Sequence, residues 1–383
     1  MMQIPFLRPC VVPPDSYRAA LDRMQATRIY SNFGPLNTEF EQRLLQELLG
    51  GEGAVTTVAN ATLGLMLAIQ ACRRPSGRLA IMPSFTFAAT PLAAQWCGLQ
   101  PYFLDVAPGD WCMAAADIEQ AVARLGDQVA VVVGCCTFGA DADLSVFQRL
   151  LDRGVPVVID AAAGLGTTRD GRPLGAGFPG AIVYSLHATK TFAVGEGGVI
   201  YSHSPALIAA IRQAENFGFG EQREATMLGM NAKMCEMLAA VALATLDQLP
   251  EKAAYRRGLA NGYREEMTRR GWLQQGWSWQ TVGEGVSPQF FPLLAPEGAE
   301  NIALIARAES AGVQIRRYFS PPCHRQAQFA ACPKGDLGFT FQLERRVLSL
   351  PLWEEMELRH IQQVLDTLEQ ARLAPRSAAH AAR

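Results

Sequence analysis

The sequence predicts an α/β protein with a mostly parallel central sheet in a large domain and a smaller C-terminal α+β domain. From residue 54 to residue 160, short apolar runs alternate with helix-like runs, as expected when a helical crossover follows each parallel strand. Runs such as VPVVID (155–160) have no polar face, which is typical of strands covered on both sides. After residue 250 the rhythm becomes irregular, which indicates a second domain.

The 383 residues are enough for two domains. We expect residues 1–250 to hold an N-terminal segment and the large domain, residues 251–373 to form the small domain, and residues 374–383 to be a disordered tail. Pro250 interrupts a long helical pattern over residues 235–270. Because proline removes a helical hydrogen bond, this position predicts a hinge between the domains.

Taken in order, the chain first predicts a helix over residues 39–49, EFEQRLLQELL. Asn37 or Thr38 would cap its start, and Gly50 or Gly51 would stop it. The strands predicted for the large sheet then follow at 54–58, 79–83, 101–105, 129–134, 155–160, 181–186 and 199–203.

A helix is expected at 204–215, and residues 215–234 should form a loop because they are polar, contain glycine and lack periodicity. In the small domain we expect a strand at 287–295, a helix at 300–312, the run VLSLPLW and a final helix.

Composition excludes several classes of protein. Hydrophobic residues make up 49% of the chain, charged residues make up 18%, and the net charge is -2, so nothing favours nucleic acid as a partner. No stretch offers the roughly 18 uninterrupted apolar residues of a membrane span, and the first residues do not resemble a signal peptide. We therefore expect a cytoplasmic protein without a membrane partner.

Metal and disulfide sites are also not predicted. The nine cysteines are scattered, odd in number and never spaced as C-x-x-C, which indicates reduced thiols. The five histidines show no metal-ligand spacing such as H-E-x-x-H.

Two residues at strand ends carry the chemistry. Asp160 ends one apolar run, and Lys190 lies on a turn after another. A buried lysine loses its proton readily and can form Schiff bases, and a buried carboxylate needs a cationic partner. Pyridoxal 5′-phosphate (PLP) satisfies both through its aldehyde and its protonated ring nitrogen. The alternative is that Asp160 caps a turn and Lys190 is a surface lysine.

The motifs DAAAG (160–164), YSLHATK (184–190) and GEGG (195–198), in this order and spacing, resemble the DegT/DnrJ/EryC1/StrS sugar aminotransferases. The segments 31–41, GMNAKM (229–234), YFSPPCH and LSLPL extend the resemblance over nearly the whole chain. The resemblance implies PLP fold type I, which is aspartate aminotransferase-like, with PLP as cofactor.

Several cofactor contacts are predicted at the carboxyl edge of the sheet. Asn60 begins a helix whose free amides suit a phosphate, although it also suits an ordinary N-cap. The resemblance assigns the phosphate to the amides of Ala61 and Thr62 and to the hydroxyl of Ser185. It also assigns ring stacking to Phe87, with Phe85 as second choice and core packing as the alternative for both.

Further roles are implied by the resemblance alone. Asn231, in GMNAKM, would reach the cofactor phosphate of the neighbouring subunit, which implies a homodimer with shared active sites. His187 and Tyr318 are candidates on the substrate side, although His187 also fits a plain turn residue. The family commonly has Gln or His where this chain has Ala163, so a hydrogen bond to the cofactor's phenolic oxygen is missing. Lys233 stands where relatives usually carry arginine.

The predicted function is a PLP-dependent transaminase that moves an amino group from L-glutamate to a keto group of a nucleotide-linked deoxysugar by a ping-pong Schiff-base mechanism. The residues argue only for imine chemistry, and the resemblance implies the sugar class and a role in polysaccharide or antibiotic sugar biosynthesis. Alternatives are a PLP- or pyridoxamine-phosphate-dependent sugar dehydratase, an aminocyclitol aminotransferase, and a non-catalytic regulatory member of the fold. Those dehydratases typically replace the Schiff-base lysine, which is present here.

Overall fold

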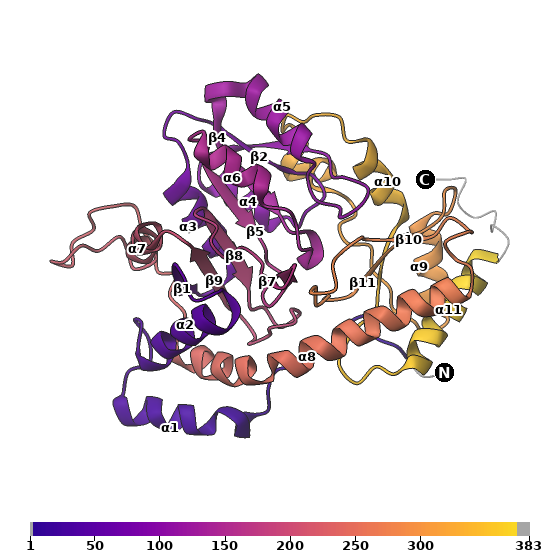
Figure 1. Cartoon of the computed structure of the whole chain (residues 1–383), viewed down its shortest axis with the longest axis horizontal. Helices are drawn as coiled ribbons and strands as arrows, with labels where there is room; N and C mark the ends of the chain where they lie inside the picture. Colours follow the sequence, from indigo (N-terminus) through magenta and orange to yellow (C-terminus); the bar gives the residue numbers. More distant parts are fainter. Residues whose placement is uncertain (1–2, 374–383) are drawn as a thin grey trace.

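The structure of the protein is a computed structural model that describes residues 3–373. The predicted tail, 374–383, lies outside the described residues. Within the described part, seven strands form the central sheet in the order β1-β9-β8-β5-β4-β2-β3 (Figure 1). They are β1 (Ala54–Val58), β2 (Leu79–Pro83), β3 (Gln100–Leu104), β4 (Val129–Cys135), β5 (Val157–Asp160), β8 (Ala181–Ser185) and β9 (Gly198–Ser202).

All neighbouring pairs in this sheet are parallel except those made by β9, which runs antiparallel to both β1 and β8. The predicted, mostly parallel sheet is therefore confirmed. Residues 186–197 connect β9 to β8 without a helix, whereas a parallel return usually runs through one.

Helices cover both faces of the sheet and bury its apolar strands from two sides. One core cluster is formed with α3, α4 and α7, and the other with α2, α5, α6 and α8. Their bounds are α2 (Pro35–Leu48), α3 (Ala61–Cys72), α4 (Ala89–Trp96), α5 (Ala115–Leu125), α6 (Ser145–Asp152), α7 (Pro205–Ala214) and α8 (Glu236–Arg269). A further helix, α1 (Arg18–Thr27), packs against α8 and α2.

The start of α2 differs from the prediction. The helix begins at Pro35 rather than near Thr38, and the side chain of Asn37 donates a hydrogen bond to Thr57 instead of capping. The carboxylate of Glu236 accepts the amides of Leu36 and Asn37 at 2.8 and 2.9 Å. A buried acid from 200 residues away therefore satisfies this N-terminus, in keeping with the preference of helix starts for negative charge.

In the described residues, the small domain contains a three-stranded antiparallel sheet and the α-helices α9, α10 and α11, besides the second half of α8. Its elements are β10 (Ser278–Trp279), β11 (Phe291–Leu294), α9 (Asn301–Ser310), α10 (Gly338–Arg346), β12 (Val347–Leu350) and α11 (Leu358–Leu373). The short hairpin of β6 (Thr168–Arg169) and β7 (Arg172–Pro173) stands apart from both sheets. Ile4, near the start of the chain, pairs with Val313 and packs in the small-domain core.

Helix α8 joins the two parts of the molecule (Figure 1). It continues through Pro250 without a break, so the predicted interruption at this residue is wrong. Leu246 packs in a core of the large domain, and Tyr263 packs in the core of the small one. Burial on both sides of the proline offsets the lost hydrogen bond. The domain boundary proposed at residue 250 therefore falls inside a helix.

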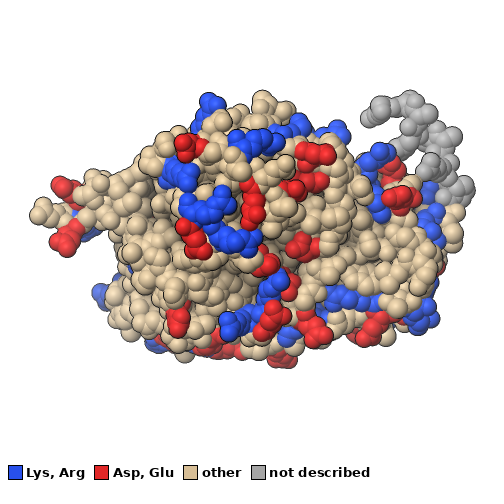
Figure 2. All heavy atoms as spheres, turned by 45° about the horizontal axis from the view of Figure 1, so that its top comes forward, with Lys and Arg blue, Asp and Glu red and all other residues tan. Residues whose placement is uncertain are grey.

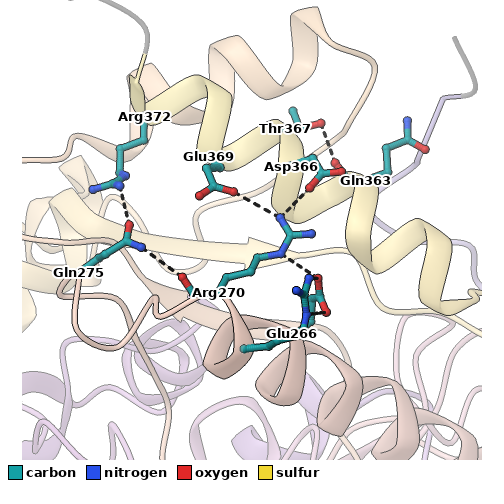
Figure 3. A network of polar contacts seen from close by, with 9 residues as sticks. Glu266, Arg270, Gln275, Gln363, Asp366, Thr367, Glu369 and Arg372 are labelled. Carbon is teal, nitrogen blue, oxygen red and sulfur yellow. Dashed lines mark hydrogen bonds and ion pairs between the residues drawn. The ribbon is translucent and has the colours of Figure 1, made fainter.

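The far end of α8 is fixed to α11 by a polar network (Figure 3). Arg270 donates to Glu266 at 2.8 Å and to Asp366 at 2.6 Å, and it also lies 3.5 Å from Glu369. Hydrogen bonds from Arg269 and Arg270, at the end of α8, lower the pKa of the Glu266 carboxyl to about 2. This network anchors the small domain to the helix that reaches the large one.

Charged side chains of both signs lie interspersed on the face shown in Figure 2. No helix within residues 3–373 is long and apolar enough to cross a membrane. In the same residues, no cluster of three His, Cys, Asp or Glu side chains could hold a metal ion.

Candidate active site

A cavity of about 840 Å³ opens at the carboxyl ends of the parallel strands, which is where such folds bind ligands. Residues that follow β1, β2, β4, β5 and β8 line it together with residues of the small-domain side. The residues expected at the carboxyl edge of the sheet therefore line one cavity. The cavity contains nine of the ten residues proposed for the site: Asn60, Ala61, Thr62, Phe87, Asp160, Ser185, His187, Lys190 and Tyr318.

Asp160 ends β5, and its carboxylate is buried, with 5% of the residue exposed. Thr90 donates a hydrogen bond to Oδ2 at 2.6 Å, and the amide of Ala162 donates to Oδ1 at 3.1 Å. Burial raises the pKa of this carboxyl, and the two hydrogen bonds oppose that shift. Among the described residues it forms no ion pair, so the site holds a buried acid without a bonded cation.

Lys190 lies on the turn after β8, as predicted, and its side chain reaches the same cavity. Burial lowers the pKa of its amine, while the nearby Asp160 opposes that shift. The amine donates a hydrogen bond to Oε1 of Gln289 at 3.1 Å. A desolvated amine of this kind is a better nucleophile at neutral pH than a surface lysine. The alternative of an ordinary surface lysine does not describe this environment.

The start of α3 presents open amides to the cavity. Asn60 is the N-cap, and its side chain accepts the amide of Leu63 at 2.9 Å. In the described chain, no hydrogen bond engages the amides of Ala61 and Thr62. Gly198 faces this turn, and a Cβ atom there would lie 2.8 Å from the nitrogen of Ala61. Glycine keeps the turn open for an anion.

The two candidate stacking residues lie in different surroundings. Phe87 lines the cavity and is 60% exposed. Phe85 is fully buried and packs edge-on against Trp111, Phe138 and Phe319. Only Phe87 therefore offers a ring face to a ligand, and Phe85 belongs to the core.

A family model for the DegT/DnrJ/EryC1/StrS aminotransferase family matches residues 15–369. The chain belongs to this family. It is 43% identical to a crystal structure of a Bacillus cereus ATCC 10987 protein named as a PLP-dependent aminotransferase, which superposes with a TM-score of 0.95 over 96% of this chain and 100% of that one.

Two further relatives are similar over most of their length. The structure of DesI in the presence of its TDP-sugar product is 33% identical, with a TM-score of 0.85, over 96% of this chain and 92% of that one. Protein Rv3402c of Mycobacterium tuberculosis is 32% identical over 96% of this chain and 90% of its own. The chain is thus a PLP-dependent aminotransferase of fold type I, as its motifs predicted.

The residues present fit PLP, the cofactor of this family. The carboxylate of Asp160, which has no ion-pair partner among the described residues, could pair with a protonated ring nitrogen. The amine of Lys190 could form an imine with an aldehyde. The open amides at the start of α3 suit the phosphate. The hydroxyl of Ser185 accepts the amide of His187 at 3.2 Å and keeps its own proton free for another acceptor. The individual cofactor contacts remain predictions.

Asn231 is the predicted site residue that does not line the cavity. It lies at the neck of a loop, residues 216–230, that projects beside α7 (Figure 1). Its side chain accepts a hydrogen bond from Lys233 at 2.8 Å, and Lys233 also donates to Asn216 at 2.7 Å. The side chain of Asn231 is therefore engaged with Lys233 and does not reach the cavity of its own chain.

Two residues of the site escaped prediction. Thr90 lies at the end of PSFTFAAT (83–90), the segment that also holds Phe85 and Phe87, but a threonine at a helix start is common and predicts no role in the site. Gln289 did leave a signal, since it is the polar residue inside the otherwise apolar run SPQFFPLLA. A buried amide of this kind needs a polar partner, and that partner is the amine of Lys190.

Proposed function

We propose that this aminotransferase moves an amino group from L-glutamate to a keto group of a nucleotide-linked deoxysugar. The observation that carries the proposal is the pairing of a desolvated lysine and a bare buried aspartate in one large cavity. The sugar class is supported by the family and by DesI, which was solved with a TDP-sugar product. A cytoplasmic location also remains part of this proposal.

Each residue has a distinct task in this mechanism. When bound, PLP supplies an aldehyde that accepts the amino group and a ring that accepts electrons. Lys190 would hold the aldehyde in the resting enzyme and, once released, carry a proton from Cα of the donor as a general base. Asp160 would keep the ring nitrogen protonated. Thr90 and the amide of Ala162 fix the orientation of that carboxylate.

The decisive experiment loads the enzyme with pyridoxamine phosphate and mixes it with a panel of nucleotide-linked keto sugars. We expect one of them to restore the PLP absorbance in a single turnover, and L-glutamate to reverse the change faster than other amino acids. Keto-cyclitols form the control panel. Recovery with a keto-cyclitol and with no nucleotide-linked sugar would contradict the sugar assignment and favour the aminocyclitol alternative.

We also propose a homodimer with shared active sites. The acidic and basic side chains that line the cavity within the described chain are those of Asp160, His187, Lys190 and Glu196, so this chain provides no arginine there for a phosphate or carboxylate. Beside the cavity, Phe87 and Trp96 are 60% and 75% exposed. Apolar rings at a cavity mouth suit a covering protein surface, and a second copy would also bring Asn231 to the phosphate.

Mixed dimers test this sharing. Lys190→Ala and Asn231→Ala subunits, each nearly inactive alone, should regain about a quarter of wild-type activity when refolded together. Random pairing makes about half of the dimers mixed, and one of the two sites in each would be intact. Activity is measured after native mass spectrometry has confirmed the mixed dimers.

Asn216→Ala is the matched control for Asn231→Ala, because it removes the other partner of Lys233 without touching the proposed phosphate contact. We expect Asn216→Ala to stay active alone. If proven mixed dimers remained inactive, Asn231 would have no role in the neighbouring site.

A further inference from the structure

The amine of Lys190 has one hydrogen-bond acceptor among the described residues, the side-chain oxygen of Gln289 at 3.1 Å. Asp160 and Cys135 are the titratable groups that face the amine. The oxygens of Asp160 already accept from Thr90 and from the amide of Ala162. Gln289 is therefore the group placed to orient the free amine.

Gln289 is itself held firmly. It is 8% exposed, and its backbone oxygen accepts a hydrogen bond from Arg256 at 3.0 Å. Arg256 is 3% exposed and forms a double hydrogen bond with Glu354, at 2.7 and 2.9 Å. Such a bidentate pair fixes both partners in direction as well as in distance. An ion pair between buried Arg256 of α8 and partly buried Glu354 of the small domain thus fixes the backbone from which the Gln289 carboxamide extends.

The direction of the carboxamide matters for the chemistry. Its oxygen accepts from the amine, its nitrogen donates to no protein group among the described residues, and Gln289 lines the cavity. A carbonyl oxygen accepts from either form of an amine, and the bond is stronger to the charged form. Gln289 therefore holds the amine in place, and its oxygen is a better partner for the charged amine than for the neutral one.

We propose that Gln289 is a positioning residue for Lys190: it holds the amine at the cavity wall whenever the lysine is not bound to the cofactor, so that the proton moves along a fixed path. This inference rests on the role proposed above for Lys190. The alternative is a structural role, in which the hydrogen bond from Lys190 to Gln289 only holds the segment around Gln289 against the turn that carries Lys190. Thr191 forms a contact of that structural kind nearby, because its hydroxyl donates a hydrogen bond to the backbone oxygen of Ser287 at 3.2 Å.

Three variants distinguish the positioning role from the structural one. Gln289→Leu removes the acceptor, and Gln289→Glu keeps an acceptor and adds a negative charge. Thr191→Val removes only the hydrogen bond between Thr191 and Ser287. The pKa of Lys190 is measured in the cofactor-free protein by trace acetylation across a pH series, read by mass spectrometry of peptides. The chain has four lysines, at 190, 233, 252 and 334, so three serve as internal references.

We expect Gln289→Leu to lower the pKa of Lys190 by about one, Gln289→Glu to raise it, and Thr191→Val to leave it unchanged. In the loaded enzyme, Gln289→Leu should reduce kcat about tenfold with little change in KM for the donor, since the loss concerns proton transfer and not binding. Gln289→Glu should recover more of kcat than Gln289→Leu does.

An unchanged Lys190 pKa in Gln289→Leu would overturn the proposal, as would an equal shift in Thr191→Val. The pKa measurement needs no cofactor and no substrate. It is therefore independent of the role proposed for Lys190, whose failure would appear separately as borohydride linking PLP to a peptide that lacks Lys190, and of the substrate, whose failure would appear in the keto-sugar panel.

Discussion

Lys190→Ala should abolish the visible absorption of lysine-linked PLP and reduce turnover by about 10³-fold or more, because it removes both a nucleophile and a general base. The variant should still bind PLP, since the open amides at the start of α3 and the carboxylate of Asp160 remain. Spectra before and after borohydride reduction, combined with single-turnover rates, provide the measurement.

Lys252→Ala is the matched control. Burial also lowers the pKa of Lys252, but this lysine lies on α8, 3.4 Å from Glu354, and does not line the cavity. We expect its variant to keep the reducible link to PLP. If a borohydride-reducible imine between PLP and the protein survived in Lys190→Ala and disappeared in Lys252→Ala, the Schiff base would belong to Lys252.

The positions of Asp160 and Lys190 could be predicted because Asp160 ends one apolar run and Lys190 lies on the turn that follows another. Such a run is buried over its whole length, so its last residue marks an edge of the sheet. The strands of the large sheet were predictable for the same reason. The location of the cavity followed as well, because parallel strands bring their carboxyl ends to one edge.

Contacts between segments far apart in the chain could not be predicted in this way. Glu236 caps α2 across 200 residues, and Gln289 reaches Lys190 across 99. Neither contact leaves a periodic pattern, since each depends on how the folded layers meet. The continuity of α8 through Pro250 is of the same kind, because packing on both sides of the proline outweighs its local effect.

Asp160→Asn should leave the fold intact and reduce turnover by about 10²- to 10⁴-fold. The amide has the shape of the carboxylate, and its oxygen can still accept from Thr90 or from the amide of Ala162. It carries no charge, however, so it cannot keep a pyridine nitrogen protonated, and the ring then accepts electrons poorly. Circular dichroism checks the fold, and single-turnover rates with L-glutamate measure the loss.

Thr90→Val provides the comparison that tests whether charge is responsible. It removes one hydrogen bond to the Asp160 carboxylate but leaves the charge in place. That hydrogen bond opposes the rise in the pKa of Asp160, so its loss should raise this pKa further and move the acid limb of the pH–rate profile to higher pH. At a pH above that limb, Thr90→Val should therefore be much more active than Asp160→Asn. Equal losses in the two variants at every pH would show that geometry, and not the negative charge, is what Asp160 contributes.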